Sequence, residues 1–212
     1  MKRIFIFSGL GTDERAFKHL EFPEHETTYI KWERPFQGET ISEYSKRLIS
    51  QIDVSSPILI GLSFGGLIAT EVSKLITPEK LILIASAATK KEIPFYYRIA
   101  GKLNIHKLLP TRFLKHQTLI SNWFFGLQTK EDKKLLGEIL NDTDSNFLRW
   151  AINLILKWSN QTRGKNVIHI HGTKDRILPY RFVKADFTIK NGGHFMTVNK
   201  SEELNAILKS LL

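Results

Sequence analysis

The stretch Pro57-Ile58-Leu59-Ile60-Gly61-Leu62-Ser63-Phe64-Gly65-Gly66 decides the fold of this chain. Its first half, up to Leu62, is continuous and apolar, which indicates a strand buried on both faces of a parallel sheet. Residues 64–76 then predict a helix that opens on two glycines. Because strand and helix approach closely at such a turn, the G-x-S-x-G pattern lifts the serine hydroxyl above the sheet. Ser63 is therefore predicted to be a nucleophile, the alternative being a chance match in a glycine-containing turn.

Strands alternate with helices outward from this segment. Strands are predicted over 3–8, 27–32, 57–62, 81–85, 166–170 and 185–189. Thr40 followed by Glu43 is a capping-box pattern, and it predicts a helix of about three turns that extends to Ile52. A last helix is predicted over 201–212. The alternation predicts an α/β fold with a doubly wound, mostly parallel sheet of about six strands.

One long segment interrupts the alternation. Residues 89–163 contain no good strand and are rich in Leu, Phe, Trp and Lys, with helical periodicity in places. Ligands of open α/β sheets bind at the carboxyl edge of the strands. We therefore predict a single domain over 1–212, with 89–163 inserted in it as a helical lid above that edge.

The acid and the base of a serine nucleophile are predicted from two later loops. A serine hydroxyl needs a histidine to take its proton, and the histidine needs a carboxylate to orient it. His171-Gly172-Thr173-Lys174-Asp175 follows the fifth strand, and Gly192-Gly193-His194 follows the sixth. Since both loops lie at strand carboxyl ends, as Ser63 does, Asp175 and His194 are predicted to converge on Ser63. The alternative interpretation is that Asp175 is an ordinary turn aspartate.

The other histidines are not predicted to be catalytic. Only His194 among the seven stands in a glycine-rich loop directly after a late strand. His169 and His171 lie on or just beyond the fifth strand, where we expect core or loop histidines satisfied by hydrogen bonds.

Acyl transfer also needs hydrogen-bond donors aimed at the developing oxyanion. The first is predicted to be the backbone N–H of Phe64, directly after the nucleophile. The second is predicted from the turn Ser8-Gly9-Leu10-Gly11 after the first strand, with the Leu10 N–H preferred over that of Gly11. The alternative is that this turn is only a tight connection.

Composition narrows the class of protein. The chain has no cysteine, which excludes disulfides and thiolate metal sites. We find neither a signal-peptide pattern nor an apolar segment near the roughly 20 residues of a membrane span, so a cytoplasmic location is expected. The net charge is +10. Nucleic-acid binding is not expected, because no zinc finger, RNP-like signature or heptad array accompanies this charge.

The predicted lid is both apolar and basic, and three interpretations remain open. It can line an acyl pocket while its cations meet an anionic leaving group. It can form an amphipathic surface that touches anionic lipid. The interpretation we favour is that its apolar face packs on the domain and its charges are solvated.

The order of these elements resembles the α/β-hydrolase superfamily over nearly the whole chain. The resemblance rests on Gly61–Gly66, on His171-Gly172-x-x-Asp175 and on Gly193-His194. It implies hydrolysis of an ester, thioester or related acyl bond without a metal or organic cofactor. The family usually has eight strands, and the resemblance implies that the first two are missing here. Ser8-Gly9 stands where many members carry His-Gly.

These observations predict a carboxylesterase-like serine hydrolase that forms an acyl-enzyme on a small-molecule substrate. Ser63 attacks, His194 transfers the proton and Asp175 orients the imidazole. One alternative keeps the triad but uses it as a base in a lyase-type reaction. Another is a non-catalytic binding protein on the hydrolase fold.

Overall fold

The computed structural model describes residues 2–104 and 118–212. Its centre is a six-stranded sheet in the order β2-β1-β3-β4-β5-β6, and every neighbouring pair is parallel. The strands are β1 (Arg3–Phe7), β2 (Glu26–Tyr29), β3 (Ile58–Leu62), β4 (Lys80–Ile84), β5 (Val167–Gly172) and β6 (Phe187–Ile189). The predicted doubly wound parallel sheet is therefore confirmed.

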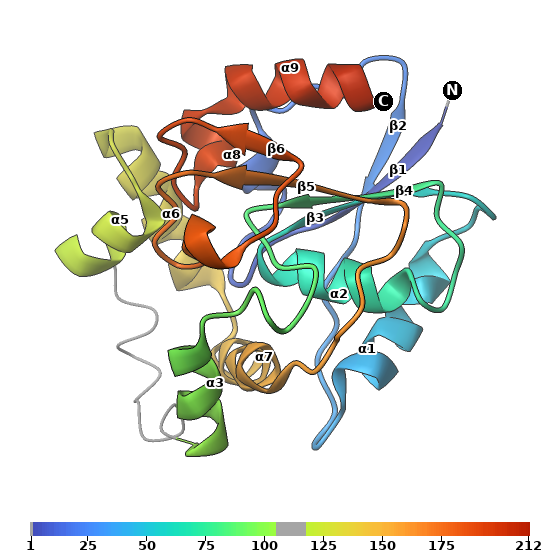
Figure 1. The fold of residues 1–212 in the computed structure, drawn as a ribbon, viewed down its shortest axis with the longest axis horizontal. Coiled ribbons are helices and arrows are strands. Elements are labelled where there is room, and N and C mark those ends of the chain that lie inside the picture. The colour runs from blue at the N-terminus through green and yellow to red at the C-terminus, as the bar shows by residue number, and fades with distance from the viewer. Residues whose placement is uncertain (1, 105–117) are drawn as a thin grey trace.

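Helices cover both faces of this sheet (Figure 1). On one side lie α1 (Ile41–Leu48), α2 (Phe64–Val72), α3 (Phe95–Lys102) and α7 (Ser145–Lys157), and on the other α8 (Met196–Asn199) and α9 (Ser201–Leu211). Two more helices, α5 (Leu119–Phe125) and α6 (Lys130–Asp142), lie at the end of the molecule away from the N-terminus. Because β1 starts at the N-terminus, that is the carboxyl-end side of the parallel strands.

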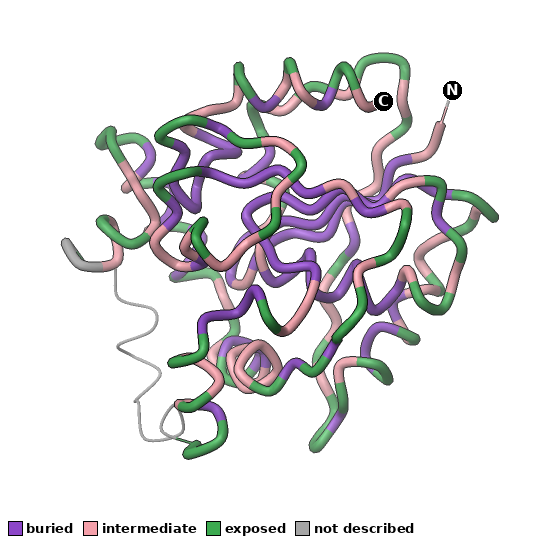
Figure 2. The backbone as a smooth tube through the Cα atoms, viewed as in Figure 1, coloured by how far each residue is buried: buried purple, intermediate pink, exposed green. Residues whose placement is uncertain are grey.

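The side chains of each strand alternate between two apolar cores. In β1, Ile4 and Ile6 join the core shared with α6, α8 and α9, whereas Phe5 and Phe7 join the core shared with α1, α2 and α7. All four are fully buried, as is the centre of the sheet in Figure 2. This two-sided burial explains why the sequences of β1, β3 and β4 are largely apolar, whereas the edge strand β2, Glu26-Thr27-Thr28-Tyr29, is mostly polar and has no buried residue.

Element ends differ from the prediction at two helices. The capping box of Thr40 and Glu43 is confirmed, but α1 ends at Leu48 and a 3₁₀ turn continues to Gln51. Helix α2 ends at Val72 rather than at residue 76. After Val72 the chain continues as turns, in which the N–H groups of Lys74 and Leu75 donate to the carbonyls of Glu71 (3.2 Å) and Val72 (2.9 Å), three residues back.

The described part of the inserted segment 89–163 consists of helices joined by turns and irregular stretches. It contains α3, α5, α6 and α7, and no strand occurs in its described part. Residues 105–117 of the predicted lid lie outside the described residues, so its function as a lid stays a prediction. No helix in the described part of the chain is long and apolar enough to cross a membrane.

Candidate active site

Ser63 lies at a strained turn between β3 and α2. Its backbone has φ 51° and ψ −119°, in the left-handed range that a residue with a side chain rarely adopts. Three hydrogen bonds hold it there. The Ser63 N–H donates to the Ile84 carbonyl oxygen (2.9 Å), and the Ser63 carbonyl accepts from the Gly66 N–H (2.9 Å) and from the Ser86 hydroxyl (2.7 Å). The turn therefore has the geometry that the G-x-S-x-G pattern predicts.

The glycines of this turn allow two close backbone approaches. A Cβ on Gly61 would lie 2.4 Å from the Cα of Gly66, so strand and helix touch there without any side chain between them. A Cβ on Gly65 would lie 2.2 Å from the carbonyl oxygens of both Phe7 and Ser8. The start of α2 is thus pressed against the end of β1, which brings the turn after β1 next to the nucleophile.

The structure brings the three predicted catalytic side chains together. The Nε2 atom of His194 lies 2.8 Å from the Ser63 hydroxyl oxygen, and its Nδ1 atom lies 2.7 Å from Oδ2 of Asp175. The other carboxylate oxygen, Oδ1, accepts from the backbone N–H groups of Ile177 and Leu178, both at 2.9 Å. Asp175 therefore makes the turn hydrogen bonds of its own loop through Oδ1 and, in addition, contacts His194 through Oδ2.

The charge state of Asp175 follows from its surroundings. Burial alone would raise the pKa of Asp175, but the charge of His194 and the hydrogen bond from its ring hold that pKa below the ordinary value. An ionised carboxylate only accepts hydrogen bonds, so the Nδ1 atom of His194 carries a hydrogen. The neutral ring then presents the lone pair of Nε2 to the Ser63 hydroxyl, as a general base requires.

The turn that carries Leu10, a predicted oxyanion donor, lies beside the nucleophile, because a Cβ on Gly9 would lie 3.5 Å from the Ser63 Cβ. Within the described residues, no hydrogen bond occupies the backbone N–H of Leu10 or of Phe64. The turn that carries Leu10 is fixed by the Thr12 N–H, which donates to the Gly9 carbonyl (3.0 Å), and by Trp32, whose indole N–H donates to the Ser8 hydroxyl (2.8 Å). The role of these two N–H groups as oxyanion donors stays a prediction.

Helices of the inserted segment contact both sides of this site. At the end of α5, the Phe125 carbonyl accepts from the Phe195 N–H (3.1 Å), and the Phe125 ring lies 5.8 Å from that of His194. Between α6 and α7, the Thr143 hydroxyl donates to the Gly11 carbonyl (3.2 Å). These contacts join segments far apart in the chain, and sequence periodicity carries no signal for them.

A cavity of about 570 Å³ lies beside the turn after β1. Thr12, Trp32, Arg34, Thr143 and Phe147 are among its lining residues. Trp32 belongs to a strand end that the sequence did locate, so its place at the carboxyl edge was predictable. The sequence did not predict that the connection between α6 and α7 also lines this cavity.

The two β5 histidines give a prediction for stability. Burial, followed by the effects of His171 and Arg163, lowers the pKa of His169 from 6.5 to about 3. Between these values the unfolded chain binds a proton that the folded chain does not. The free energy of unfolding should therefore fall as the pH drops below about 6.5, by roughly 1.4 kcal/mol per pH unit from His169. Burial also lowers the pKa of His171, so that residue acts in the same direction.

Urea unfolding between pH 4 and 8 measures this slope, and the His169→Gln variant should show a shallower one. Burial raises the pKa of Glu92. The contribution of Glu92 to the free energy of unfolding therefore decreases as the pH rises, opposite to the contribution of His169. The comparison of wild type with His169→Gln removes that contribution. Equal slopes in the two proteins would show that His169 is protonated in the folded state.

Comparisons with known proteins support the fold. The sequence matches no protein-family model and has no significant match among curated proteins. Among solved structures, it is similar to an esterase from Thermogutta terrifontis (14% identity, TM-score 0.74, covering 100% of this chain and 89% of that one). It is also similar to the esterase EaEST from Exiguobacterium antarcticum (16%, 0.69, 100% and 91%) and to Est816, an N-acyl homoserine lactone degrading enzyme (15%, 0.71, 100% and 93%). The chain therefore has the α/β-hydrolase fold.

Proposed function

We propose that this protein is a serine hydrolase that cleaves a carboxylic ester or thioester of a small molecule through an acyl-enzyme. The observation that carries the proposal is the continuous hydrogen-bonded chain from the Ser63 hydroxyl through His194 to Asp175. Structural neighbours described as esterases support the same class of reaction.

The geometry supports a two-step reaction. His194 accepts the Ser63 proton on Nε2 while the serine oxygen attacks the acyl carbon, and the N–H groups of Leu10 and Phe64 stabilise the oxyanion that forms. The protonated ring then donates its proton to the leaving alcohol or thiol, which departs and leaves an acyl group on Ser63. A water molecule, deprotonated by His194, attacks the acyl-enzyme. The bond from the acyl carbon to the Ser63 oxygen then breaks, His194 returns the proton to that oxygen, and the acid is released.

The helices of the inserted segment are proposed to form a lid over this reaction. The supporting contacts are those of Phe125 with the His194 loop and of Thr143 with the turn after β1. Phe64 and Phe147 pack edge to face at 6.2 Å, which adds an apolar wall near the nucleophile. An acyl chain bound there would be shielded from water during the first step.

Pre-steady-state kinetics with a chromogenic ester test the acyl-enzyme. We expect a burst of released alcohol with an amplitude close to one equivalent per active site, followed by slower turnover, for any ester whose deacylation is rate-limiting. A series of acyl chain lengths provides such an ester. Hydrolysis without a burst, together with no trapped acyl-serine in quenched samples across the series, would contradict the acyl-enzyme.

A further inference from the structure

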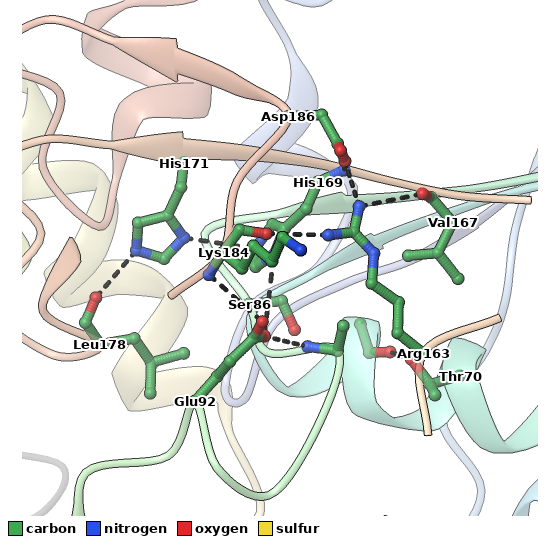
Figure 3. Close-up of polar contacts among 12 residues, drawn as sticks. Thr70, Ser86, Glu92, Arg163, Val167, His169, His171, Leu178, Lys184 and Asp186 are labelled. Atoms are coloured by element: carbon green, nitrogen blue, oxygen red, sulfur yellow. Dashed lines mark hydrogen bonds and ion pairs between the residues drawn. The ribbon is translucent and has the colours of Figure 1, made fainter. Parts of the chain in front are cut away.

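A buried polar chain extends from the candidate triad into the core, through side chains that the proposed reaction does not use. His169 and His171 lie two residues apart on β5, so both point to the same face of the sheet, and both are fully buried. Figure 3 shows their rings in line between Leu178 and Glu92. Buried polar side chains are costly unless hydrogen-bonded, so their partners carry information about their role.

The contacts of His171 fix its tautomer. Its Nε2 atom lies 2.8 Å from the Leu178 carbonyl oxygen, which can only accept, so Nε2 carries the hydrogen. The same atom lies 3.4 Å from Oδ2 of Asp175, the oxygen that also accepts from His194. The N–H of His171 therefore donates to Leu178, and the positively polarised edge of the ring lies beside the candidate catalytic carboxylate. The opposite tautomer would turn a lone pair towards the negative charge.

His169 contacts the other nitrogen of the His171 ring and favours the same tautomer. In neutral His171, Nδ1 is an acceptor, and the Nε2 atom of His169 lies 3.3 Å from it and donates. The Nδ1 atom of His169 has no hydrogen-bond partner among residues 2–104 and 118–212, and it lies 3.8 Å from Oε2 of Glu92. Glu92 is itself buried and accepts from the backbone N–H groups of Ala88 (2.6 Å) and Lys184 (3.2 Å).

The charged neighbours of this chain lie at its ends. Arg163 pairs with Asp186, which also accepts from the His169 backbone N–H (2.7 Å), so this guanidinium is already neutralised. The ring of Tyr180 stacks on that of His171 at 6.5 Å. No group of three or more histidine, aspartate or glutamate side chains in residues 2–104 and 118–212 could hold a metal ion. A metal site within the described residues therefore does not explain the two histidines.

We infer that His171 is a positioning residue for Asp175: its Nε2–H, which donates to the Leu178 carbonyl, also places a partial positive charge 3.4 Å from Oδ2, and His169 holds it in the tautomer that makes this possible. The inference rests on the proposed function, in which Asp175 orients His194. The sequence motif His171-Gly172-x-x-Asp175 is then more than a strand end, since its first residue supports its last. His171 stays neutral and moves no proton.

The direction of the effect follows from the shared oxygen. The partial positive charge of the His171 N–H stabilises the Asp175 carboxylate and competes with His194 for its negative charge. Without this donor, more of that charge stabilises the imidazolium form of His194. His194 must be neutral to act as a base, so the acid limb of the kcat/KM profile should move to higher pH, by about half a unit in His171→Leu.

Matched variants separate this role from packing. Leucine is close to histidine in volume but has no donor, whereas the side-chain amide of His171→Gln can donate from nearly the same position as Nε2. We expect His171→Gln to bring the acid limb most of the way back to its wild-type position. The exposed His19 provides the control, because His19→Leu removes a histidine that has no contact with the triad. An acid limb that stays in place in His171→Leu would overturn the inference.

Long-range ¹⁵N–¹H spectra of the histidine rings test the same claim without any turnover. In the wild-type protein we expect His169 and His171 to be neutral Nε2–H tautomers from pH 5 to 9. The ring signals of His194 should titrate at higher pH in His171→Leu than in wild type. A Nδ1–H tautomer or a titrating ring at His171 would overturn the inference even if the leucine variant fails to fold. If Ser63 shows no hydrolytic activity, the proposed function fails, but these spectra still decide whether His171 supports Asp175.

Discussion

Replacing Ser63 by alanine is expected to lower the kcat/KM of ester hydrolysis by about 10⁴-fold or more. The hydroxyl is the atom that forms the acyl bond, and its hydrogen bond to His194 is the first link of the triad. His194→Ala should cost a similar factor, because an unactivated hydroxyl is a poor nucleophile. Steady-state hydrolysis by each purified variant measures both losses.

The double variant and a distant serine provide the controls. Ser63→Ala combined with His194→Ala should be hardly slower than either single variant, since the two residues act as a unit. Ser73→Ala, at the end of α2, should hydrolyse the same ester at the wild-type rate, because its hydroxyl bonds only to the Thr70 carbonyl. Multiplicative losses in the double variant would mean that the two side chains contribute separately.

Gly65→Ala is expected to destabilise the folded protein by about 3 kcal/mol or more. The added Cβ would meet two backbone carbonyl oxygens at 2.2 Å, and neither can move without disturbing β1 or the turn that carries Leu10. Urea unfolding of the wild-type and variant proteins measures the difference. The activity of any folded fraction should also fall, because relief of the clash displaces the nucleophile turn from the predicted oxyanion donor.

Gly38→Ala is the matched control for this substitution. Gly38 has φ +76°, but no atom lies within 4 Å of the position its Cβ would take. The substitution therefore carries only the backbone penalty of the left-handed region, about 1 kcal/mol. A Gly65→Ala variant no less stable than Gly38→Ala would show that α2 does not press on β1 as described.

The sheet and the placement of the candidate triad were predictable from the sequence, because both depend on local patterns. Buried apolar runs mark the inner strands, and each predicted catalytic side chain lies in the turn or loop that follows β3, β5 or β6. Parallel strands end at one edge, so residues that follow β3, β5 and β6 must converge there. The same reasoning located the turn of Leu10 beside Ser63.

What sequence reasoning missed depends on contacts between distant segments. Strand β5 runs to Gly172 rather than to residue 170 because Gly172 pairs with Ile189 of β6, a partner that no local pattern specifies. The contact of Phe125 with the His194 loop is of the same kind. His171 was expected to be a satisfied core histidine, and its bond to the Leu178 carbonyl confirms that it is satisfied. One feature of the sequence pointed to its second contact, with Asp175: the two residues are four positions apart at the end of one strand and in the loop that follows it.

Covalent labelling with a fluorophosphonate probe, followed by mass spectrometry of the peptides, tests the central claim most directly. It requires no knowledge of the substrate and reports only a serine that a neighbouring base activates. Our account predicts one adduct, on Ser63, that is absent in Ser63→Ala and strongly reduced in His194→Ala. An unlabelled folded protein, with and without mild detergent to loosen the proposed lid, or an adduct on another residue, would contradict it.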